Sequence, residues 1–301
     1  MNIHSVSRSM VAVRASVPED AFTADTLGIR REGSGVVIRK DGLVLTIGYL
    51  ITEADEVWLV DRDGRNVPAH PLAYDQETGF GLVQALGRLD LPPLEFGDIA
   101  HAAIGDPVVL VDGLGQSVEA NIVAKQEFAG YWEYLLDEAV FIAPAHASWG
   151  GAALVDPEGK LLGIGSLRLQ MSKGGEIADI NMIVPISLLP PILDDLLKRG
   201  QVNKPPRPWL GVFSAESNGE VVVMSVAEGG PAEKAGLQQG DIISDIRDKE
   251  IDGLADFYRQ VWESGPAGIE VPMRVIRDGR ETWLRLKSAD RNSFLKKPQI
   301  Q

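Results

Sequence analysis

The feature that most constrains the fold is a long series of short β-forming runs separated by glycine and aspartate turns. Runs rich in valine, leucine and isoleucine recur between residues 10 and 142, and Lys40-Asp41-Gly42 and Asp61-Arg62-Asp63-Gly64 follow two of them. Turns of this composition join antiparallel strands. Many short strands of this kind predict a β-sandwich or a β-barrel. The expected strands are residues 10–16, 33–38, 43–46, 56–60, 81–85, 107–111, 121–124 and 139–142.

A proline-rich stretch, residues 201–208, divides the chain and predicts a semi-rigid linker. Residues 187–199 before it predict a helix, with Gly200 as its C-cap. After it, apolar residues between Leu254 and Glu263 fall at i, i+3, i+4, i+7 and i+8, which indicates one amphipathic helix. The chain of 301 residues therefore predicts two domains. Their expected bounds are 1–200 and 209–288, followed by a polar tail, 289–301.

Composition excludes several classes of partner and site. A net charge of −14 argues against nucleic acid and anionic membranes as partners. The absence of cysteine excludes disulfides and thiolate sites. The four histidines are not spaced as metal ligands, so we expect neither a metal nor another cofactor. No apolar run approaches the ~20 residues that span a bilayer. The first ten residues lack the apolar stretch of a signal peptide, which predicts a cytoplasmic protein, or a periplasmic one if a leader was removed.

A turn of small residues lies mid-chain, at Ala145-His146-Ala147-Ser148-Trp149-Gly150-Gly151-Ala152, and a strand-like run at 160–166 follows it. Three other phrases accompany it: G-S-G-V-V-I from Gly33, G-L-G-Q-S-V from Gly113, and G-P-A-x-x-A-G-L-x-x-G-D-x-I from Gly230. Together they resemble the HtrA-type family, in which a trypsin-fold protease is joined to a PDZ domain. The resemblance implies a mainly β protein with a trypsin-like double six-stranded β-barrel followed by a PDZ domain.

The resemblance also locates the catalytic positions, and all three hold other residues here. The family phrase N-P-G-N-S-G-G-P-L-V, anchored on Gly159 and Gly163-Ile164, puts the nucleophilic serine at Gly150. The family's base falls on Tyr49 and its acid on Gly79. Acyl transfer by serine needs a hydroxyl beside a base that an acid orients. A phenol with a pKa of ~10 is a poor base near neutrality. The sequence therefore predicts a pseudoprotease.

Two alternatives stay open at this point. Catalysis could have moved to a dyad of Ser148 and His146, although no carboxylate neighbours the pair in the sequence. The plainer interpretation makes Ser148 a turn residue and His146 a loop histidine. Alternatively, the barrel could grip unfolded chains as a holdase-like chaperone.

The PDZ-like part keeps more of its family pattern. The resemblance implies that backbone N–H groups of a loop, Trp209-Leu210-Gly211-Val212, receive the terminal carboxylate of a peptide, which adds as a strand beside Val212 and Phe213. Helix residues Phe257, Tyr258 and Val261 would line the groove, and we expect at least two of them to be core residues. The predicted function is thus a peptide-binding adaptor or scaffold for protein C-termini, either monomeric or trimeric.

Overall fold

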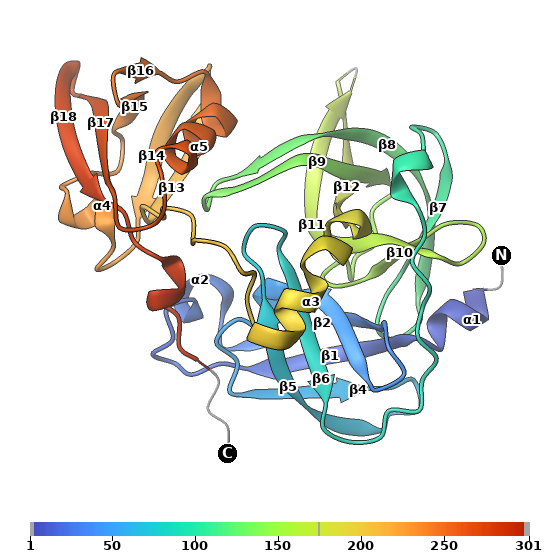
Figure 1. Cartoon of the computed structure of the whole chain (residues 1–301). Coiled ribbons are helices and arrows are strands. Elements are labelled where there is room, and N and C mark those ends of the chain that lie inside the picture. Colours follow the sequence, from blue (N-terminus) through green and yellow to red (C-terminus); the bar gives the residue numbers. More distant parts are fainter. Residues whose placement is uncertain (1–2, 174, 298–301) are drawn as a thin grey trace. The chain divides into compact units, whose positions relative to one another are not determined.

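The structure is a computed structural model that describes residues 3–173 and 175–297 (Figure 1). The chain forms two compact units. The barrel unit contains the chain up to residue 126, residues 138–203 and the residues from 296 onward. The sheet unit contains residues 204–295 together with a separate segment, residues 127–137.

The barrel unit holds two closed six-stranded barrels. The first has the strand order β1-β2-β3-β6-β5-β4 and the second the order β10-β11-β12-β9-β8-β7. The strands of the first barrel are β1 (Met10–Ser16), β2 (Arg30–Val37), β3 (Leu43–Ile47), β4 (Glu56–Val60), β5 (Asn66–Tyr74) and β6 (Phe80–Ala85). Those of the second are β7 (Pro107–Val111), β8 (Ser117–Gly130), β9 (Tyr134–Ala143), β10 (Ala153–Val155), β11 (Leu161–Lys173) and β12 (Glu176–Pro185).

Helices of the barrel unit are short and lie before, between or after the strands. They are α1 (Ile3–Ser7), α2 (Ala24–Leu27) and α3 (Pro190–Arg199), with 3-10 turns at η1 (Gly48–Leu50), η2 (Ile99–His101) and η3 (Ile186–Leu188). Helix α3 begins at Pro190, three residues later than predicted, because the first part of the predicted run forms η3. It ends as predicted at Gly200, whose left-handed backbone lets its N–H donate to the Leu196 carbonyl.

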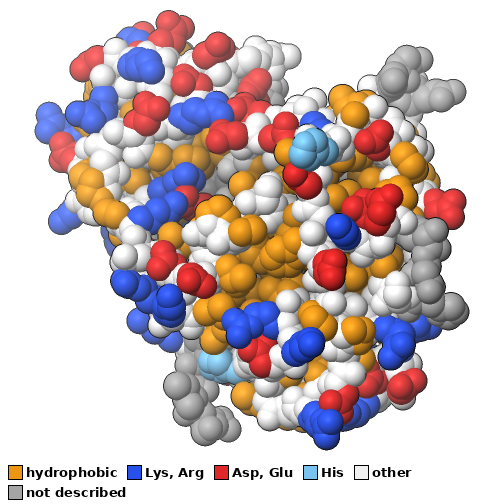
Figure 2. All heavy atoms as spheres, turned by 45° about the vertical axis from the view of Figure 1, so that its right-hand side comes forward, with side chains coloured by type: hydrophobic (Ala, Val, Ile, Leu, Met, Phe, Trp, Pro, Cys, Tyr) orange, Lys and Arg blue, Asp and Glu red, His pale blue; other side chains and the backbone are white. Residues whose placement is uncertain are grey.

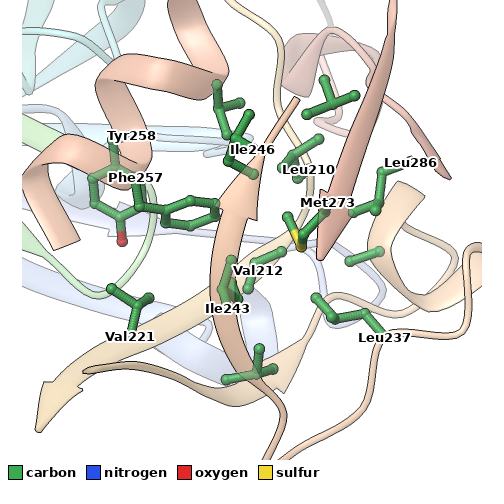
Figure 3. Packing of buried hydrophobic residues seen from close by; sticks show 14 of the residues in the cluster. Leu210, Val212, Val221, Leu237, Ile243, Ile246, Phe257, Tyr258, Met273 and Leu286 are labelled. Carbon is green, nitrogen blue, oxygen red and sulfur yellow. The ribbon is translucent and has the colours of Figure 1, made fainter. Parts of the chain in front are cut away.

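The sheet unit is one antiparallel sheet with a helix packed against it. Its strands are β13 (Val212–Ser217), β14 (Glu220–Val226), β15 (Ile242–Ile246), β16 (Lys249–Glu250), β17 (Glu270–Arg277) and β18 (Arg280–Lys287). Its helices are α4 (Pro231–Lys234) and α5 (Gly253–Glu263), and η4 (Arg291–Ser293) is a 3-10 turn. Figure 3 shows the core of this unit, where Phe257 and Tyr258 of α5 face Val221 and Ile243 of the sheet.

The predicted mainly β architecture, a double barrel followed by a second β domain, is confirmed. Burial explains the strand pattern, because every residue of β3 is buried and β5 alternates between buried and more exposed positions. On the face shown in Figure 2, acidic and basic side chains are interspersed with hydrophobic ones. The net charge of −14 is therefore not gathered into one patch there.

The units depart from the sequence-predicted domain bounds in two places. Residues 127–137, between the predicted strands 121–124 and 139–142, form the tip of the β8–β9 hairpin and pack with the sheet unit. The predicted tail also makes defined contacts. Trp209 and Ala289 exchange two backbone hydrogen bonds of 2.9 Å, and the Phe294 ring lies 4.8 Å from that of Trp209. Residues 298–301 of the tail lie outside the described residues.

Candidate functional site

Tyr49 and Gly150, the positions at which the sequence analysis expects the family's base and nucleophile, are neighbours in the barrel unit. Tyr49 lies in η1, directly after β3, and its hydroxyl donates a hydrogen bond of 2.9 Å to the Ser166 carbonyl. A Cβ atom added at Gly150 would lie 2.8 Å from that hydroxyl oxygen. This is closer than carbon and oxygen atoms approach in well-packed interiors. The phenol therefore occupies the space that a side chain at position 150 would need.

Gly79, which aligns with the family's acid, lies beside the same turn. Its carbonyl accepts a hydrogen bond of 2.7 Å from the N–H of Gly48, the residue before Tyr49. Its backbone has a φ of 82°, in the left-handed region that glycine adopts without a steric cost. Position 79 thus contributes backbone groups and a sharp turn to this site, with no ionisable side chain.

The Tyr49 hydroxyl is a poor candidate for a base in this setting. Burial raises the pKa of Tyr49 far above its ordinary value because the phenolate would lose its hydration. The phenol therefore stays protonated near neutral pH. Its chemical role here is to donate a hydrogen bond and to fill volume.

Ser148 and His146, the alternative dyad, lie close together, but the hydrogen bond between them comes from the Ser148 backbone and not from its hydroxyl. The Ser148 N–H donates to His146 Nδ1 at 2.9 Å, and the His146 N–H donates to Asn181 Oδ1 at 2.7 Å. In the described part of the chain, no hydrogen bond joins the Ser148 hydroxyl to an imidazole. Because Nδ1 accepts a hydrogen bond, the neutral ring carries its proton on Nε2. The imidazole is therefore not positioned to take the proton of Ser148.

Asp112 is a site residue that the sequence analysis missed. Its Oδ2 lies 4.0 Å from His146 Nε2, and both side chains are buried. The other oxygen, Oδ1, accepts the N–H groups of Leu114 and Gln116. The sequence offers no carboxylate next to His146, yet the fold brings one to the ring from the end of β7. No local pattern could have indicated this pairing, because 34 residues separate the two positions in the sequence.

Two backbone groups of the turn at 150–151 are hydrogen-bonded within the fold. The Gly151 N–H donates to the Gly165 carbonyl at 2.8 Å, and the Gly150 carbonyl accepts the Ser34 N–H at 2.8 Å. An open pocket of about 370 Å³ adjoins this turn. It is lined by residues 12–14, 32–34, 49–50, 112–114 and 147–150. The pocket offers a binding surface without an assembled nucleophile.

The predicted carboxylate-binding loop of the sheet unit holds a carboxylate from the same chain. The side chain of Glu133 accepts the N–H of Gly211 at 2.7 Å and that of Val212 at 3.0 Å, both on Oε1. The Leu210 N–H lies 3.0 Å from Oε2. Burial raises the pKa of Glu133 to about 7, while these three N–H groups and Arg291 oppose the rise.

The other predicted groove residues divide between the core and the groove. Leu210, Val212, Phe257 and Val261 belong to the hydrophobic core of the sheet unit. Tyr258 packs in the same core, and its hydroxyl reaches the segment that holds Glu133. The ring of Phe213 lies 6.2 Å from that of Tyr131, and the ring of Trp209 is tilted by 59° against that of Phe294. Sequence reasoning missed Glu133, since the segment 127–137 has no pattern that points to a PDZ groove.

Among the described residues, no cluster of histidine, aspartate and glutamate side chains could hold a metal ion. His101 contacts Asp98 at 2.8 Å on an exposed 3-10 turn, as a single pair. In the same described part, no helix is both long and apolar enough to cross a membrane.

Known protein families match both the barrel unit and the sheet unit of this chain. A family model described as a trypsin-like peptidase domain matches residues 33–164, and one described as a PDZ domain matches residues 208–287. The chain is homologous to the HtrA-type serine proteases.

Individual relatives agree with this assignment. A probable periplasmic serine protease, do/HhoA-like, of Haemophilus influenzae is 29% identical over 87% of this chain and 59% of its own length. The serine protease Do-like HtrA of Bacillus subtilis is 25% identical over 85% of this chain and 63% of its own. The serine endoprotease DegS of Escherichia coli K12 is 29% identical over 86% of this chain and 77% of its own. The chain thus spans about three-fifths of the first two relatives.

Solved structures of HtrA-type proteases share the fold. The HtrA-type protease AlgW with decapeptide matches with a TM-score of 0.56 and 23% identity, over 99% of this chain and 100% of its own. A serine endoprotease from Yersinia pestis matches with a TM-score of 0.54 and 22% identity, over 96% of this chain and 98% of its own.

Proposed function

We propose that this HtrA-type chain is a proteolytically inactive, peptide-binding protein that acts as an adaptor or scaffold through its PDZ domain. The observation that carries the proposal is the contact between Tyr49 and Gly150. The phenol takes the volume of the nucleophile, and its own hydroxyl is committed to the Ser166 carbonyl. Three roles of the triad are then absent together, which forfeits most covalent catalysis.

The proposed activity is recognition of peptide carboxylates. The loop 210–212 presents three converging N–H groups, the donors that a carboxylate needs. One similar structure is that of the HtrA-type protease AlgW with a decapeptide, which supports peptides as the ligand class.

A direct test is to incubate the full chain with unfolded casein and with a fluorophosphonate probe, beside an active HtrA-type protease. We expect no casein cleavage and no labelled serine. Casein cleavage that Ser148→Ala abolishes would instead establish the relocated dyad. The hydrogen bond from the Ser148 N–H to His146 Nδ1 argues against that outcome, because this ring nitrogen already accepts a hydrogen bond from the backbone of Ser148.

The holdase alternative is separable by a second assay. Suppression of aggregation by the full chain that persists after Val212→Pro, which removes one donor of the carboxylate loop at the first residue of β13, would favour the barrel as the binding surface. Loss of the effect would favour the PDZ groove.

Location and assembly are part of the proposal. We propose a cytoplasmic location, with the periplasmic location that the names of several relatives state as the alternative. Cell fractionation distinguishes the two. Light scattering distinguishes the monomer from the trimer.

A further inference from the structure

The turn that carries Glu133 has an unusual backbone. Glu133 has a φ of 56°, in the left-handed region that residues with a side chain rarely adopt. Such a conformation persists only where surrounding contacts hold it. Here it lies at the tip of the β8–β9 hairpin, between Tyr131 and Tyr134. Contacts with the surrounding residues therefore stabilise this turn.

The first contact is the carboxylate itself. Glu133 is only 5% exposed, and its two oxygens receive the consecutive N–H groups of Leu210, Gly211 and Val212. A carboxylate buried in this way is stable only when such donors replace water. Only one carboxylate can accept these three donors at a time.

The backbone of the tip is bound as a peptide would be. The Ser214 N–H, on β13, donates to the Tyr131 carbonyl at 2.9 Å. From the other side, the Tyr258 hydroxyl of α5 donates to the Gly130 carbonyl at 2.7 Å and accepts the Glu133 N–H at 3.3 Å. The tip therefore lies between the strand and the helix that form the groove.

Side chains flanking the tip add a hydrophobic and an ionic contact. Leu135 is 8% exposed and packs in the hydrophobic core of the sheet unit. Arg259, also on α5, pairs with Asp137 at 2.8 Å and with Glu127, one on each side of the tip. Both ends of the segment are thus tied to the helix, and the segment belongs to the sheet unit although its strands continue into the second barrel.

We infer that the hairpin tip, residues 127–137, is an internal ligand of the PDZ groove, in which the Glu133 carboxylate takes the place of a peptide's terminal carboxylate. Given the proposed peptide-binding function, on which this rests, a partner C-terminus must displace the tip before it can bind. Because the tip is tethered, its effective concentration is high, of the millimolar order for short linkers. The apparent affinity for a free peptide is reduced accordingly.

Hydrogen exchange of the full chain, measured without a partner peptide, tests whether the hairpin tip occupies the loop 210–212. The variant Glu133→Ala removes the acceptor, and Tyr258→Phe removes the anchor of the tip and leaves Glu133 in place. Glu119→Gln, a matched loss of charge at an exposed position of β8, is the control. We expect the amides of Leu210, Gly211 and Val212 to exchange about tenfold faster or more in the first two variants and unchanged in the control. Unchanged exchange in both test variants would overturn the inference.

Peptide capture then tests the competition. The probe is a fluorescein-labelled pool of decapeptides with randomised final residues and a free carboxylate, with the amidated pool as its reference. We expect Glu133→Ala to retain about tenfold more of the free-carboxylate pool than the wild type and Glu119→Gln, because the tethered competitor is gone. Equal retention by all three proteins would show that the tip does not compete.

The two assays separate this inference from the proposed function. Faster exchange without retention of either pool by any variant would support the internal contact and count against peptide binding. Strong retention with unchanged exchange would support peptide binding and refute the internal ligand.

Discussion

Tyr49 and Gly150 are coupled through a single volume: the oxygen of the tyrosine lies 2.8 Å from the point where a Cβ atom at position 150 would be. Moving the Tyr49 side chain away would break a hydrogen bond, because its hydroxyl donates to the Ser166 carbonyl inside the barrel unit. Tyr49 and Gly150, the expected base and nucleophile positions, are therefore adjacent and share one space. The effect of a substitution at either position on stability therefore depends on the residue at the other position.

Gly150→Ala should destabilise the chain by about 1–3 kcal/mol, since the added methyl group overpacks against the phenol. In a Tyr49→Phe background the oxygen is absent, so the same change should cost less, with a coupling of about 1 kcal/mol. Urea unfolding of the two single variants and the double variant measures this. Additive effects would mean that the side chains do not share the space.

Gly150→Ser alone should remain inert toward the fluorophosphonate probe. The new hydroxyl would meet a protonated phenol, since burial holds the pKa of Tyr49 far above neutrality. Tyr49→His together with Gly150→Ser restores both a base and room, so we expect slow labelling of residue 150 only in that variant. Mass spectrometry of the labelled peptide decides. Labelling in the single variant would show that another base serves the site.

Glu133 should make the stability of the sheet unit decrease with rising pH. Its pKa is raised from 4.5 to about 7 by burial, so the folded state binds the proton more tightly than the unfolded state between these values. Its favourable contribution is complete below the unfolded pKa and is lost as the pH rises through about 7, with a span of about 3 kcal/mol. Tyr258 and Arg291 are the neighbouring charged or titratable groups, and burial raises the pKa of Tyr258 far above this range.

Urea unfolding of the wild type and Glu133→Gln at about pH 5 and about pH 8 checks this dependence. The stability of the wild type relative to the variant should fall between the two conditions. Glu119→Gln should follow the wild type. A relative stability that rises with pH would contradict the predicted sign.

Glu53 should show the opposite dependence in the barrel unit. It too is buried and left-handed, with a φ of 63°. Burial acts to raise the pKa of Glu53, but the Thr23 hydroxyl and backbone N–H groups of Lys296, Thr23 and Phe22 outweigh it, so the pKa is lowered below 4.5. Its stabilising contribution is therefore present above the unfolded pKa and is lost as the pH falls through the folded pKa.

Glu53→Gln should thus destabilise the barrel unit by about 1–3 kcal/mol near neutrality, since a charge-assisted acceptor is removed from buried donors. The difference from the wild type should shrink as the pH falls through the lowered folded pKa of Glu53. Urea unfolding at several pH values, with the exposed Glu32→Gln as the control, measures it. A difference that grows on acidification would contradict the assignment.

Local sequence determined the elements of this protein. The strand 107–111 was predictable because it is a short run of β-forming residues, four of which are buried. The helix α5 was predictable because burial of one face imposes a period of 3.6. The family phrases indicated both domains and the turn at 145–152.

Tertiary structure alone decided which side chains meet. Asp112 reaches His146, the Tyr49 hydroxyl fills the space beside Gly150, and Glu133 enters a loop that lies 78 residues further along the chain. None of these pairs has a periodic or adjacent signature, since each depends on how distant strands close into barrels or sheets. The closure of the strands determines which residues meet at long sequence separation. The sequence around each residue therefore does not indicate its partner.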